Sequence, residues 1–195
     1  MVRVLVVNNY PSRERVETLE RCLKGNGAEV APSELGDVSS RNFDSYDGVV
    51  LSGSPAMMTD DKTVSRFQPE VDAILDSTVP ILGVCFGHQL MAHAFGAEVV
   101  KGGRHILGMV KTTVLRNDPL FDGLPKSLML LESRYEEVKF LPDGFTLLAR
   151  SATSRIATMK HRTRLLYGVQ FHPERFNRRH PEGDRVVGNF VRMLR

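Results

Sequence analysis

Short apolar runs alternate with amphipathic segments along the first half of the chain. The runs at 2–7, 28–31, 49–51 and 80–84 are mostly apolar, which is typical of parallel strands buried on both faces. Between and after them, apolar residues recur at helical spacing over 13–24, over 64–75 and over the segment that ends at Gly96. This alternation predicts an α/β fold with a doubly wound, mostly parallel sheet flanked by helices. Functional sites in such a sheet lie at the carboxyl ends of its strands.

Local signals refine the first two helices. We expect Ser12 to cap the first helix, whose buried face carries Val16, Leu19 and Leu23. The second helix is expected to bury positions 67, 71, 74 and 75, and to tolerate Pro69 only near its first turn. The stretch 34–44 is polar and is interpreted as a connection to the third strand.

The second half of the chain changes character. Strand-like runs at 107–115, 127–132, 145–150, 155–160 and 165–170 are separated by turns, with little helix until a final amphipathic segment at 184–194. This pattern predicts an antiparallel extension of the same sheet. A chain of 195 residues with 42% apolar content can close one sizeable core, so we predict a single domain over 1–195.

Composition argues against several classes of protein. The two cysteines, Cys22 and Cys85, have neither metal-site nor CxxC spacing, so we expect no disulfide framework and a reducing, cytoplasmic location. No apolar run approaches the roughly 18 residues of a membrane span. The net charge of +3 is mild and does not indicate nucleic-acid binding. A basic run at 175–185 is interpreted as a solvated face, with partner docking as the alternative.

Cys85 is the candidate nucleophile. It follows the apolar run 80–84 directly, and Gly83 and Gly87 flank it two positions to either side. This is the thiol counterpart of the G-x-S-x-G elbow, and the helix predicted to begin there would favour the thiolate. Cysteine is also among the most buried residue types, so an ordinary core role for Cys85 is the alternative. Cys22 lies beside the apolar face of its helix and is interpreted as structural.

His172 and Glu174 are the candidate partners of Cys85. They end the apolar run 165–171, and residues two apart in an extended chain point to the same side, so Glu174 can orient the His172 imidazole. A base with an orienting group is what a nucleophilic thiol requires. We predict no metal site, because His88 and His93 lie five positions apart and His105 and His180 lie in polar, arginine-rich segments interpreted as solvated.

Three segments together resemble the class-I, triad-type glutamine amidotransferases. Residues 83–89 (G-V-C-F-G-H-Q) and 168–174 (G-V-Q-F-H-P-E) are similar to the two signatures of that family, and 51–55 (L-S-G-S-P) to its L-S-G-G-P oxyanion loop. Residues 132–138 (E-S-R-Y-E-E-V) resemble the E-S-H-x-D-E-V segment of the stand-alone glutaminase subunits of archaeal-type GMP synthetases. The resemblance spans the whole chain and implies the flavodoxin-like fold of the family.

The sequence departs from the family pattern at three positions. Ser54 replaces a glycine and would be strained if the loop required a positive φ there. Arg134 replaces histidine, and we expect it to place a fixed positive charge near the mouth of the site, complementary to an acidic patch on a partner. Glu136 replaces aspartate.

The resemblance implies a glutaminase. Cys85 would attack the side-chain amide of glutamine, His172 would carry the thiol proton to departing ammonia, and Glu174 would orient His172. The backbone N–H groups implied for the oxyanion hole belong to Phe86 and to the loop of Gly53 and Ser54. The residues implied to contact glutamine are Gln89, Tyr135 and Glu136. No metal or organic cofactor is implied for this step.

The resemblance also implies a partner. The chain contains no G-x-x-x-x-G-K-[ST] motif, so ATP and magnesium are expected on a separate synthase, the GMP synthetase ATP-pyrophosphatase subunit. Residues 101–104 (K-G-G-R) lack this motif and are interpreted as a polar turn at the rim of the site. The alternatives are delivery of ammonia to another synthase such as anthranilate synthase, hydrolysis of a γ-glutamyl compound without any synthase, and a catalytically silent regulatory subunit. The complete Cys85–His172–Glu174 set argues against a silent subunit, while Ser54 and Arg134 leave it open.

Overall fold

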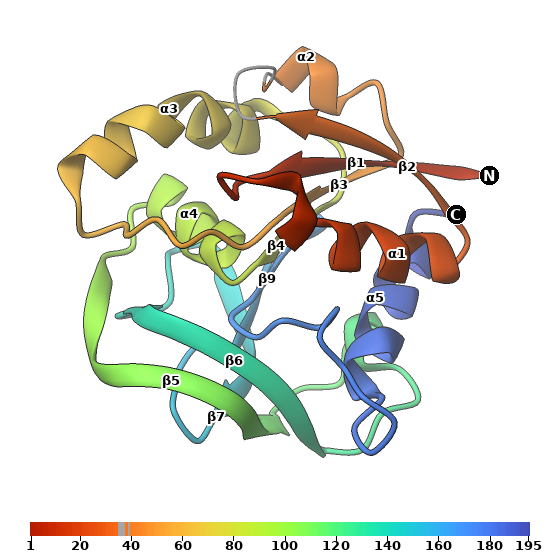
Figure 1. The fold of residues 1–195 in the computed structure, drawn as a ribbon, viewed down its shortest axis with the longest axis vertical. Helices are drawn as coiled ribbons and strands as arrows, with labels where there is room; N and C mark the ends of the chain where they lie inside the picture. Colours follow the sequence, from red (N-terminus) through yellow and green to blue (C-terminus); the bar gives the residue numbers. More distant parts are fainter. Residues whose placement is uncertain (35–37, 39) are drawn as a thin grey trace.

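A single mixed β-sheet runs through the part of the chain that the computed structural model describes, residues 1–34, 38 and 40–195 (Figure 1). Its strand order is β2-β1-β3-β4-β9-β8-β7-β5-β6. The strands are β1 (Val2–Asn8), β2 (Ala28–Glu34), β3 (Gly48–Leu51), β4 (Ile81–Val84), β5 (Val99–Val114), β6 (Ser127–Val138), β7 (Phe145–Ser151), β8 (Thr158–His161) and β9 (Leu166–Val169).

Helices cover both faces of the parallel part of this sheet. They are α1 (Glu17–Gly25), α2 (Ser40–Phe43), α3 (Asp61–Asp76), α4 (Phe86–Ala94) and α5 (Glu182–Met193), with short 3-10 turns at Arg13–Arg15 and Pro119–Phe121. Alternate residues of β1 point to opposite faces, as strand geometry requires. Val4 and Val6 belong to the core that contains α1 and α5, whereas Leu5 and Val7 belong to the core that contains α2, α3 and α4. The predicted doubly wound arrangement is confirmed.

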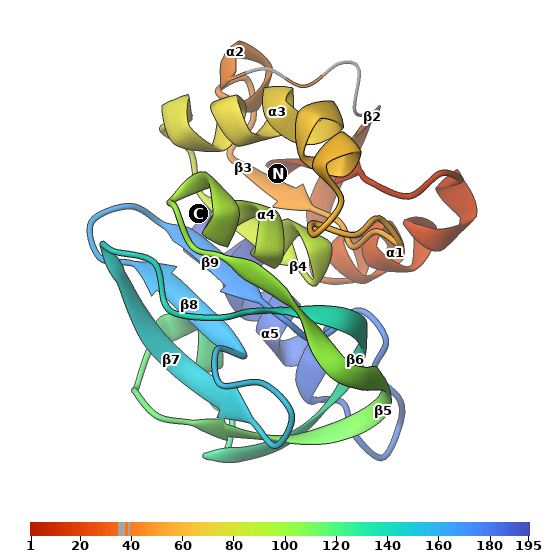
Figure 2. The same ribbon diagram turned by 90° about the vertical axis from the view of Figure 1, so that its left-hand side faces the viewer.

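The remaining strands form the predicted antiparallel extension. β9 joins β4 in parallel, and β8, β7, β5 and β6 follow with antiparallel pairing. Figure 2 shows β5 and β6 side by side. Both are longer than predicted, and the segment 101–104, interpreted from the sequence as a polar turn, lies within β5. Lys101 pairs with Glu136 and Ile106 pairs with Arg134, and the register shifts between these two pairs.

Two details of the first helix and its cap differ from prediction. Arg13–Arg15 forms a 3-10 turn, and the α-helix begins only at Glu17. Ser12 precedes the turn in an extended conformation, but its side chain makes no capping hydrogen bond, so the predicted cap is wrong. The apolar face is as predicted, because Val16 and Leu23 are fully buried.

The second helix, α3, also begins earlier than predicted. Asp60 caps it by accepting a hydrogen bond from the Lys62 N–H, and this places Pro69 in the middle of the helix instead of its first turn. A mid-helix proline removes one backbone N–H, so packing of the buried face must hold the helix together there. Leu75, predicted on that face, is 42% exposed.

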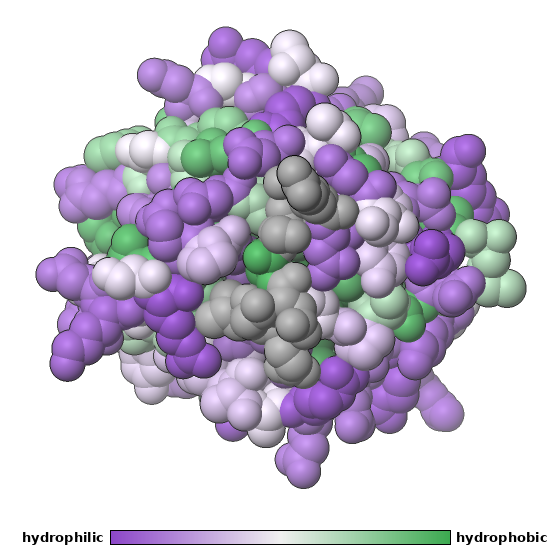
Figure 3. All heavy atoms as spheres, turned by 90° about the horizontal axis from the view of Figure 1, so that it is seen from above, coloured by the Kyte–Doolittle hydropathy of each residue, from purple (hydrophilic) through white to green (hydrophobic). Residues whose placement is uncertain are grey.

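The α2–α3 end of the molecule is mainly hydrophilic on its outside. In Figure 3, which views this end from above, hydrophilic residues predominate and hydrophobic ones form small separate groups. The polar stretch predicted at 34–44 contains α2, and residues 35–37 and 39 lie outside the described residues. Across 1–34, 38 and 40–195, no helix is long and apolar enough to span a membrane.

Candidate active site

The carboxyl ends of four neighbouring parallel strands meet at one edge of the sheet. β4 lies between β3 and β9, and β1 pairs with the other side of β3. Cys85 follows β4, the Ser52–Gly53 segment follows β3, and His172 comes three residues after the end of β9. The topology therefore places the predicted nucleophile between the predicted oxyanion loop and the predicted base.

Cys85 sits on a sharp turn between β4 and α4. Its φ is +52° and its ψ is −96°, and it is the one residue other than glycine with a positive φ in the described part of the chain. Such a conformation costs about 1–3 kcal/mol and persists only where the surroundings fix it. Here the Cys85 N–H donates to the Val169 carbonyl oxygen at 2.8 Å.

The two glycines beside Cys85 make this turn possible. A Cβ on Gly83 would lie 2.5 Å from the Gly87 carbonyl oxygen, and a Cβ on Gly87 would lie 2.6 Å from the Leu51 carbonyl oxygen. Both distances are shorter than van der Waals contact, so a side chain at either position would push α4 away from the strands. The predicted elbow is therefore present, with both glycines required by close backbone packing.

His172 and Glu174 form a buried pair. The His172 Nδ1 lies 2.8 Å from Glu174 Oε1, and both side chains are about 5% exposed. Burial alone would lower the pKa of His172, but the charges of Glu174 and Cys85 outweigh it and raise that pKa to about 10. The arrangement therefore favours the imidazolium form of His172.

A cavity of about 280 Å³ opens onto Cys85 and His172. The Cys85 Sγ lies 3.7 Å from the Ser133 carbonyl oxygen and 3.9 Å from Gln170 Nε2. The predicted site residues Ser54, Gln89, Tyr135 and Glu136 also line the cavity, whereas Gly53, Phe86 and Glu174 are not among its lining residues. The cavity has room for a ligand the size of an amino acid.

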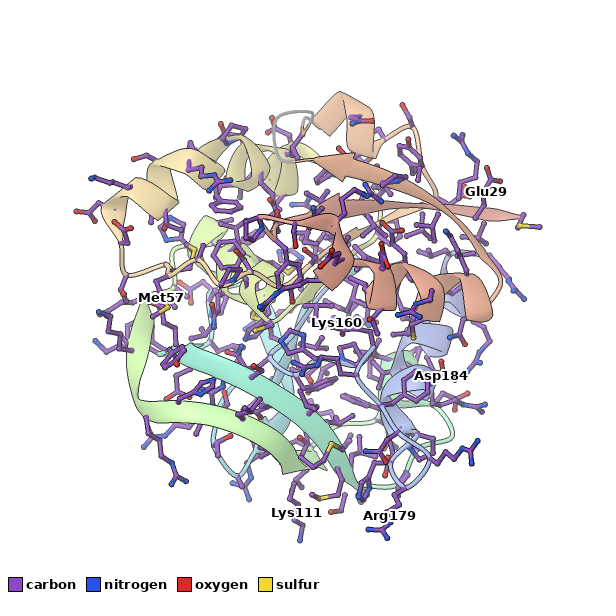
Figure 4. All side chains as sticks on the ribbon, in the orientation of Figure 1. Glu29, Met57, Lys111, Lys160, Arg179 and Asp184 are labelled. Atoms are coloured by element: carbon purple, nitrogen blue, oxygen red, sulfur yellow. The ribbon has the colours of Figure 1, made fainter. Side chains whose placement is uncertain are left out.

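Glu136 lines the cavity, and its backbone and its side chain bind different neighbours. Its carbonyl oxygen accepts a hydrogen bond from Gln89 Nε2 at 2.9 Å. Its carboxylate instead accepts the backbone N–H groups of Met58, at 2.6 Å, and Thr59, at 3.0 Å. Met57, labelled in Figure 4, directly precedes these two residues. The Glu136 side chain therefore anchors the segment that follows the oxyanion loop.

The loop after β3 approaches the base closely. A Cβ on Gly53 would lie 2.5 Å from the Tyr10 hydroxyl oxygen and 2.9 Å from His172 Cε1, so only glycine fits. Ser54 does not have a positive φ, and its Oγ accepts the Ala56 N–H at 3.0 Å. The strain considered for a serine at this position is absent.

Comparison with known proteins identifies the family. The family model for glutamine amidotransferase class-I matches residues 5–193. The chain belongs to the class-I glutamine amidotransferases. This amidotransferase is 33% identical to one of the subunits of glutamine-hydrolyzing GMP synthase from Archaeoglobus fulgidus and 34% identical to its counterpart from Methanothermobacter thermautotrophicus, over 100% of each pair of chains. A solved structure from Thermoplasma acidophilum, described as a GMP synthase subunit, superposes with a TM-score of 0.87 at 34% identity, over 100% of this chain and 94% of that one.

Arg134 of the amidotransferase lines the cavity, as expected of a residue near the mouth, but its side chain is buried and does not present an exposed charge to a partner. Its side chain is 2% exposed and pairs with Glu132, whose Oε2 lies 3.0 Å from Arg134 Nε. Its two terminal nitrogens donate to the carbonyl oxygens of Thr153 and Glu136. Even-numbered residues of β6 point inward, so the strand register and not the family substitution decides where this charge lies.

Several residues that were not predicted as site residues also line the cavity, among them Tyr10, Arg15, His105 and Arg175. His105 is exposed, as expected, and its ring stacks on that of Tyr135, which is also exposed, with centroids 4.2 Å apart. Tyr10 directly follows the Asn8–Asn9 end of the first strand, so the rule that sites lie at carboxyl ends of strands could have included it. His105 carried no such signal, because the sequence around it indicated a turn.

Cys22 is a structural thiol in this amidotransferase, as predicted. Its Sγ donates to Asp184 Oδ1 at 3.5 Å, and Figure 4 shows Asp184 on α5 beside α1. Burial, and then the Asp184 carboxylate, raise the pKa of the Cys22 thiol. His88 is also a packing residue, since burial and then the Arg134 charge lower its pKa to about 3. Among the described residues, no cluster of three or more His, Cys, Asp or Glu side chains could hold a metal ion.

Proposed function

We propose that this amidotransferase hydrolyses the side-chain amide of glutamine to glutamate and ammonia, with Cys85 as nucleophile, His172 as proton carrier and Glu174 as the orienting carboxylate. One observation carries the proposal. A cysteine on a strained elbow shares a cavity with a histidine whose other ring nitrogen is held 2.8 Å from a buried carboxylate. This is the nucleophile–base–orienter arrangement of covalent acyl transfer.

The ring geometry assigns the proton path. Because His172 Nδ1 donates to Glu174, Nε2 is the nitrogen free to exchange a proton with the Cys85 thiol. The thiolate attacks the amide carbon, and His172 gives its proton to the nitrogen that leaves as ammonia. Water then attacks the γ-glutamyl thioester, and release of the thiol completes the cycle with glutamate as the second product.

Two backbone N–H groups are proposed to hold the oxyanion. They belong to Phe86, the first residue of α4, and to Ser54, in the loop after β3. Loss of one such donor typically lowers turnover by about 10²–10³. The side chain of Gln89 and the backbone of Tyr135 and Glu136 are proposed to bind the glutamine, since all three residues line the cavity. These groups supply the nucleophile, the acid–base function and the oxyanion donors, so we propose that the step needs no metal or organic cofactor.

We further propose that the ammonia passes to a separate GMP synthetase ATP-pyrophosphatase subunit, which binds ATP and magnesium and converts XMP to GMP. Full-length similarity to proteins named as subunits of glutamine-hydrolyzing GMP synthase supports this partner. Cys22 and Cys85 are free thiols, which supports a reducing, cytoplasmic location.

Substitution of the nucleophile tests the function. Cys85→Ala should abolish ammonia release from glutamine while the melting curve stays near that of wild type. Cys22→Ala is the matched control and should keep wild-type activity. Equal activity of Cys85→Ala and wild type would refute the assignment of the nucleophile.

A second measurement tests the partner. Addition of the candidate ATP-pyrophosphatase subunit with XMP and ATP should raise ammonia release at least about tenfold, an effect of about 1.4 kcal/mol on the barrier, and should yield GMP. Ammonia release without GMP would instead favour another synthase or a free γ-glutamyl hydrolase.

A further inference from the structure

Three buried polar side chains lie next to the oxyanion loop. They are Glu70 of α3, Asn9 after β1 and Ser52 after β3, and none is more than 5% exposed. Asn9 Nδ2 donates to Glu70 Oε1 at 3.0 Å, and the Asn9 backbone N–H donates to Ser52 Oγ at 2.8 Å. Burial of polar groups is costly unless they are hydrogen-bonded, so this chain of contacts fixes the Ser52 hydroxyl from one side.

The direction of the Ser52 hydroxyl proton follows from these contacts. The oxygen accepts the Asn9 N–H, and its own proton is donated to the Gly53 carbonyl oxygen at 2.9 Å. That carbonyl belongs to the same peptide group as the Ser54 N–H. In a trans peptide the C=O and N–H point in opposite directions, so holding the carbonyl toward Ser52 turns the Ser54 N–H away from Ser52.

Gly53 needs this restraint because it has no side chain to limit its backbone. The close approach of Tyr10 and His172 excludes a Cβ, which leaves the Gly53 dihedral angles free to rotate. The next residue is restricted differently, since Pro55 disfavours the helical region for Ser54. Rotation of the Gly53–Ser54 peptide would bring a carbonyl oxygen to the place where the N–H must be, and that oxygen would repel an oxyanion.

We propose that Ser52 is a positioning residue for glutamine hydrolysis: its hydroxyl holds the Gly53 carbonyl so that the Ser54 N–H faces the tetrahedral intermediate. Ser52 does not touch the substrate. Its donated hydrogen bond also polarises the peptide, which strengthens the N–H as a donor. Asn9 orients the hydroxyl, and Glu70 anchors the Asn9 amide. The inference rests on the proposed glutaminase function and deepens it.

Ser52→Ala in a Cys22→Ala background tests the proposal. Turnover with glutamine should fall at least about tenfold and up to the roughly 10²–10³-fold loss expected when an oxyanion donor is removed, while KM stays within about threefold. Ser52→Thr keeps the hydroxyl and should recover part of the turnover. Ser154→Ala is the matched control, because Ser154 is 3% exposed, its hydroxyl makes no hydrogen bond and it lies outside the site.

Alkylation of Cys85 by iodoacetamide separates an oxyanion defect from general damage. The thiolate displaces iodide and a C–S bond forms without any tetrahedral oxyanion, so Ser52→Ala should be alkylated at the wild-type rate. Unchanged turnover in Ser52→Ala would overturn the inference, and so would parallel losses of turnover and alkylation rate. A wild-type protein that releases no ammonia from glutamine, with its partner present, would overturn the proposed function itself and this inference with it.

Discussion

Removal of Arg134 should destabilise the fold far more than removal of a surface arginine. Arg134 lies inside β6 with its Nε 3.0 Å from Glu132 Oε2, and Glu132 is fully buried. Glu132 also accepts a hydrogen bond from Thr153 Oγ1 at 2.7 Å, but its other carboxylate oxygen has no hydrogen-bond partner. Arg134→Met keeps much of the side-chain volume and leaves this carboxylate without its cation.

The expected size of the effect follows from burial. Loss of one partner of a buried ion pair costs about 3–5 kcal/mol, because the remaining charge stays out of water. The carbonyl oxygens of Thr153 and Glu136 also lose the donors that Arg134 supplies. A domain is stable by only about 5–15 kcal/mol, and for a chain of this size each kcal/mol corresponds to roughly 2–4 °C in Tm. We therefore expect Tm to fall by about 6–20 °C.

Urea denaturation of four proteins measures the coupling: wild type, Arg134→Met, Glu132→Gln and the double variant. The double variant should be more stable than the sum of the single losses predicts, by about 1–3 kcal/mol, since it leaves no buried charge unpaired. Arg150→Met, at an exposed arginine of β7, is the control and should lie within about 0.5 kcal/mol of wild type. A similarly small effect for Arg134→Met, or strict additivity in the cycle, would refute the buried-pair reasoning.

Two further predictions concern other buried positions. Gly83→Ala should lower the free energy of unfolding by about 2 kcal/mol or more and remove most of the glutaminase activity, because its Cβ would lie 2.5 Å from the Gly87 carbonyl oxygen. Gly103→Ala is the control, because its Cβ meets no atom within 4 Å, and its melting temperature should be near that of wild type. Equal melting temperatures for the two variants would contradict the packing argument. Burial raises the pKa of Glu70 from 4.5 to about 8, so between these pH values the folded protein keeps a proton that the unfolded chain releases. The stability that this proton contributes is full below about pH 4.5 and is lost as the pH rises toward 8. Glu70→Gln cannot titrate, so urea unfolding at pH 5 to 9 should show a gain over wild type that grows with pH; a constant difference would show that Glu70 does not titrate in this range.

The parallel half of the sheet was predictable because burial on both faces leaves an unambiguous pattern. The runs that became β1, β3 and β4 are mostly apolar, and a strand apolar on both faces is typical of the interior of an α/β sheet. The site followed from the same reasoning, since Cys85 and His172 both come directly after such runs. Chain topology then places them at one edge of the sheet without any further information.

The antiparallel half was less predictable because its strand boundaries depend on pairing with neighbouring strands more than on the pattern of apolar residues in each strand. Residues 101–104 (K-G-G-R) indicated a polar turn, since two glycines and two basic residues fall together, but they lie within β5, which pairs with β6 on either side of them at Lys101 and Ile106. For this reason His105 was not predicted to line the cavity.

The sequence of β6 contains a pattern that indicates the burial of Arg134. Leu128 and Leu130 share the inward face of β6 with Glu132 and Arg134, because side chains alternate along a strand. Two leucines followed at the same period by an acid and a base indicate a buried ion pair. The position of Arg134 in the strand register, and not its departure from the family pattern, decides that it is buried.

The structure restrains the parts of the proposed active site to different degrees. Cys85 is fixed by a backbone hydrogen bond to Val169 and by the two glycines that pack around its turn, and His172 is fixed by Glu174 and by its N–H bond to the Leu131 carbonyl oxygen at 2.7 Å. The Gly53–Ser54 peptide lies beyond the last ladder pair of β3, at Leu51, so the sheet does not restrain it. Its orientation depends on the hydrogen bond that the Ser52 hydroxyl donates to the Gly53 carbonyl oxygen at 2.9 Å. This peptide is therefore less restrained than Cys85 or His172, so Ser52→Ala is expected to change its orientation, and with it turnover, while the triad stays in place.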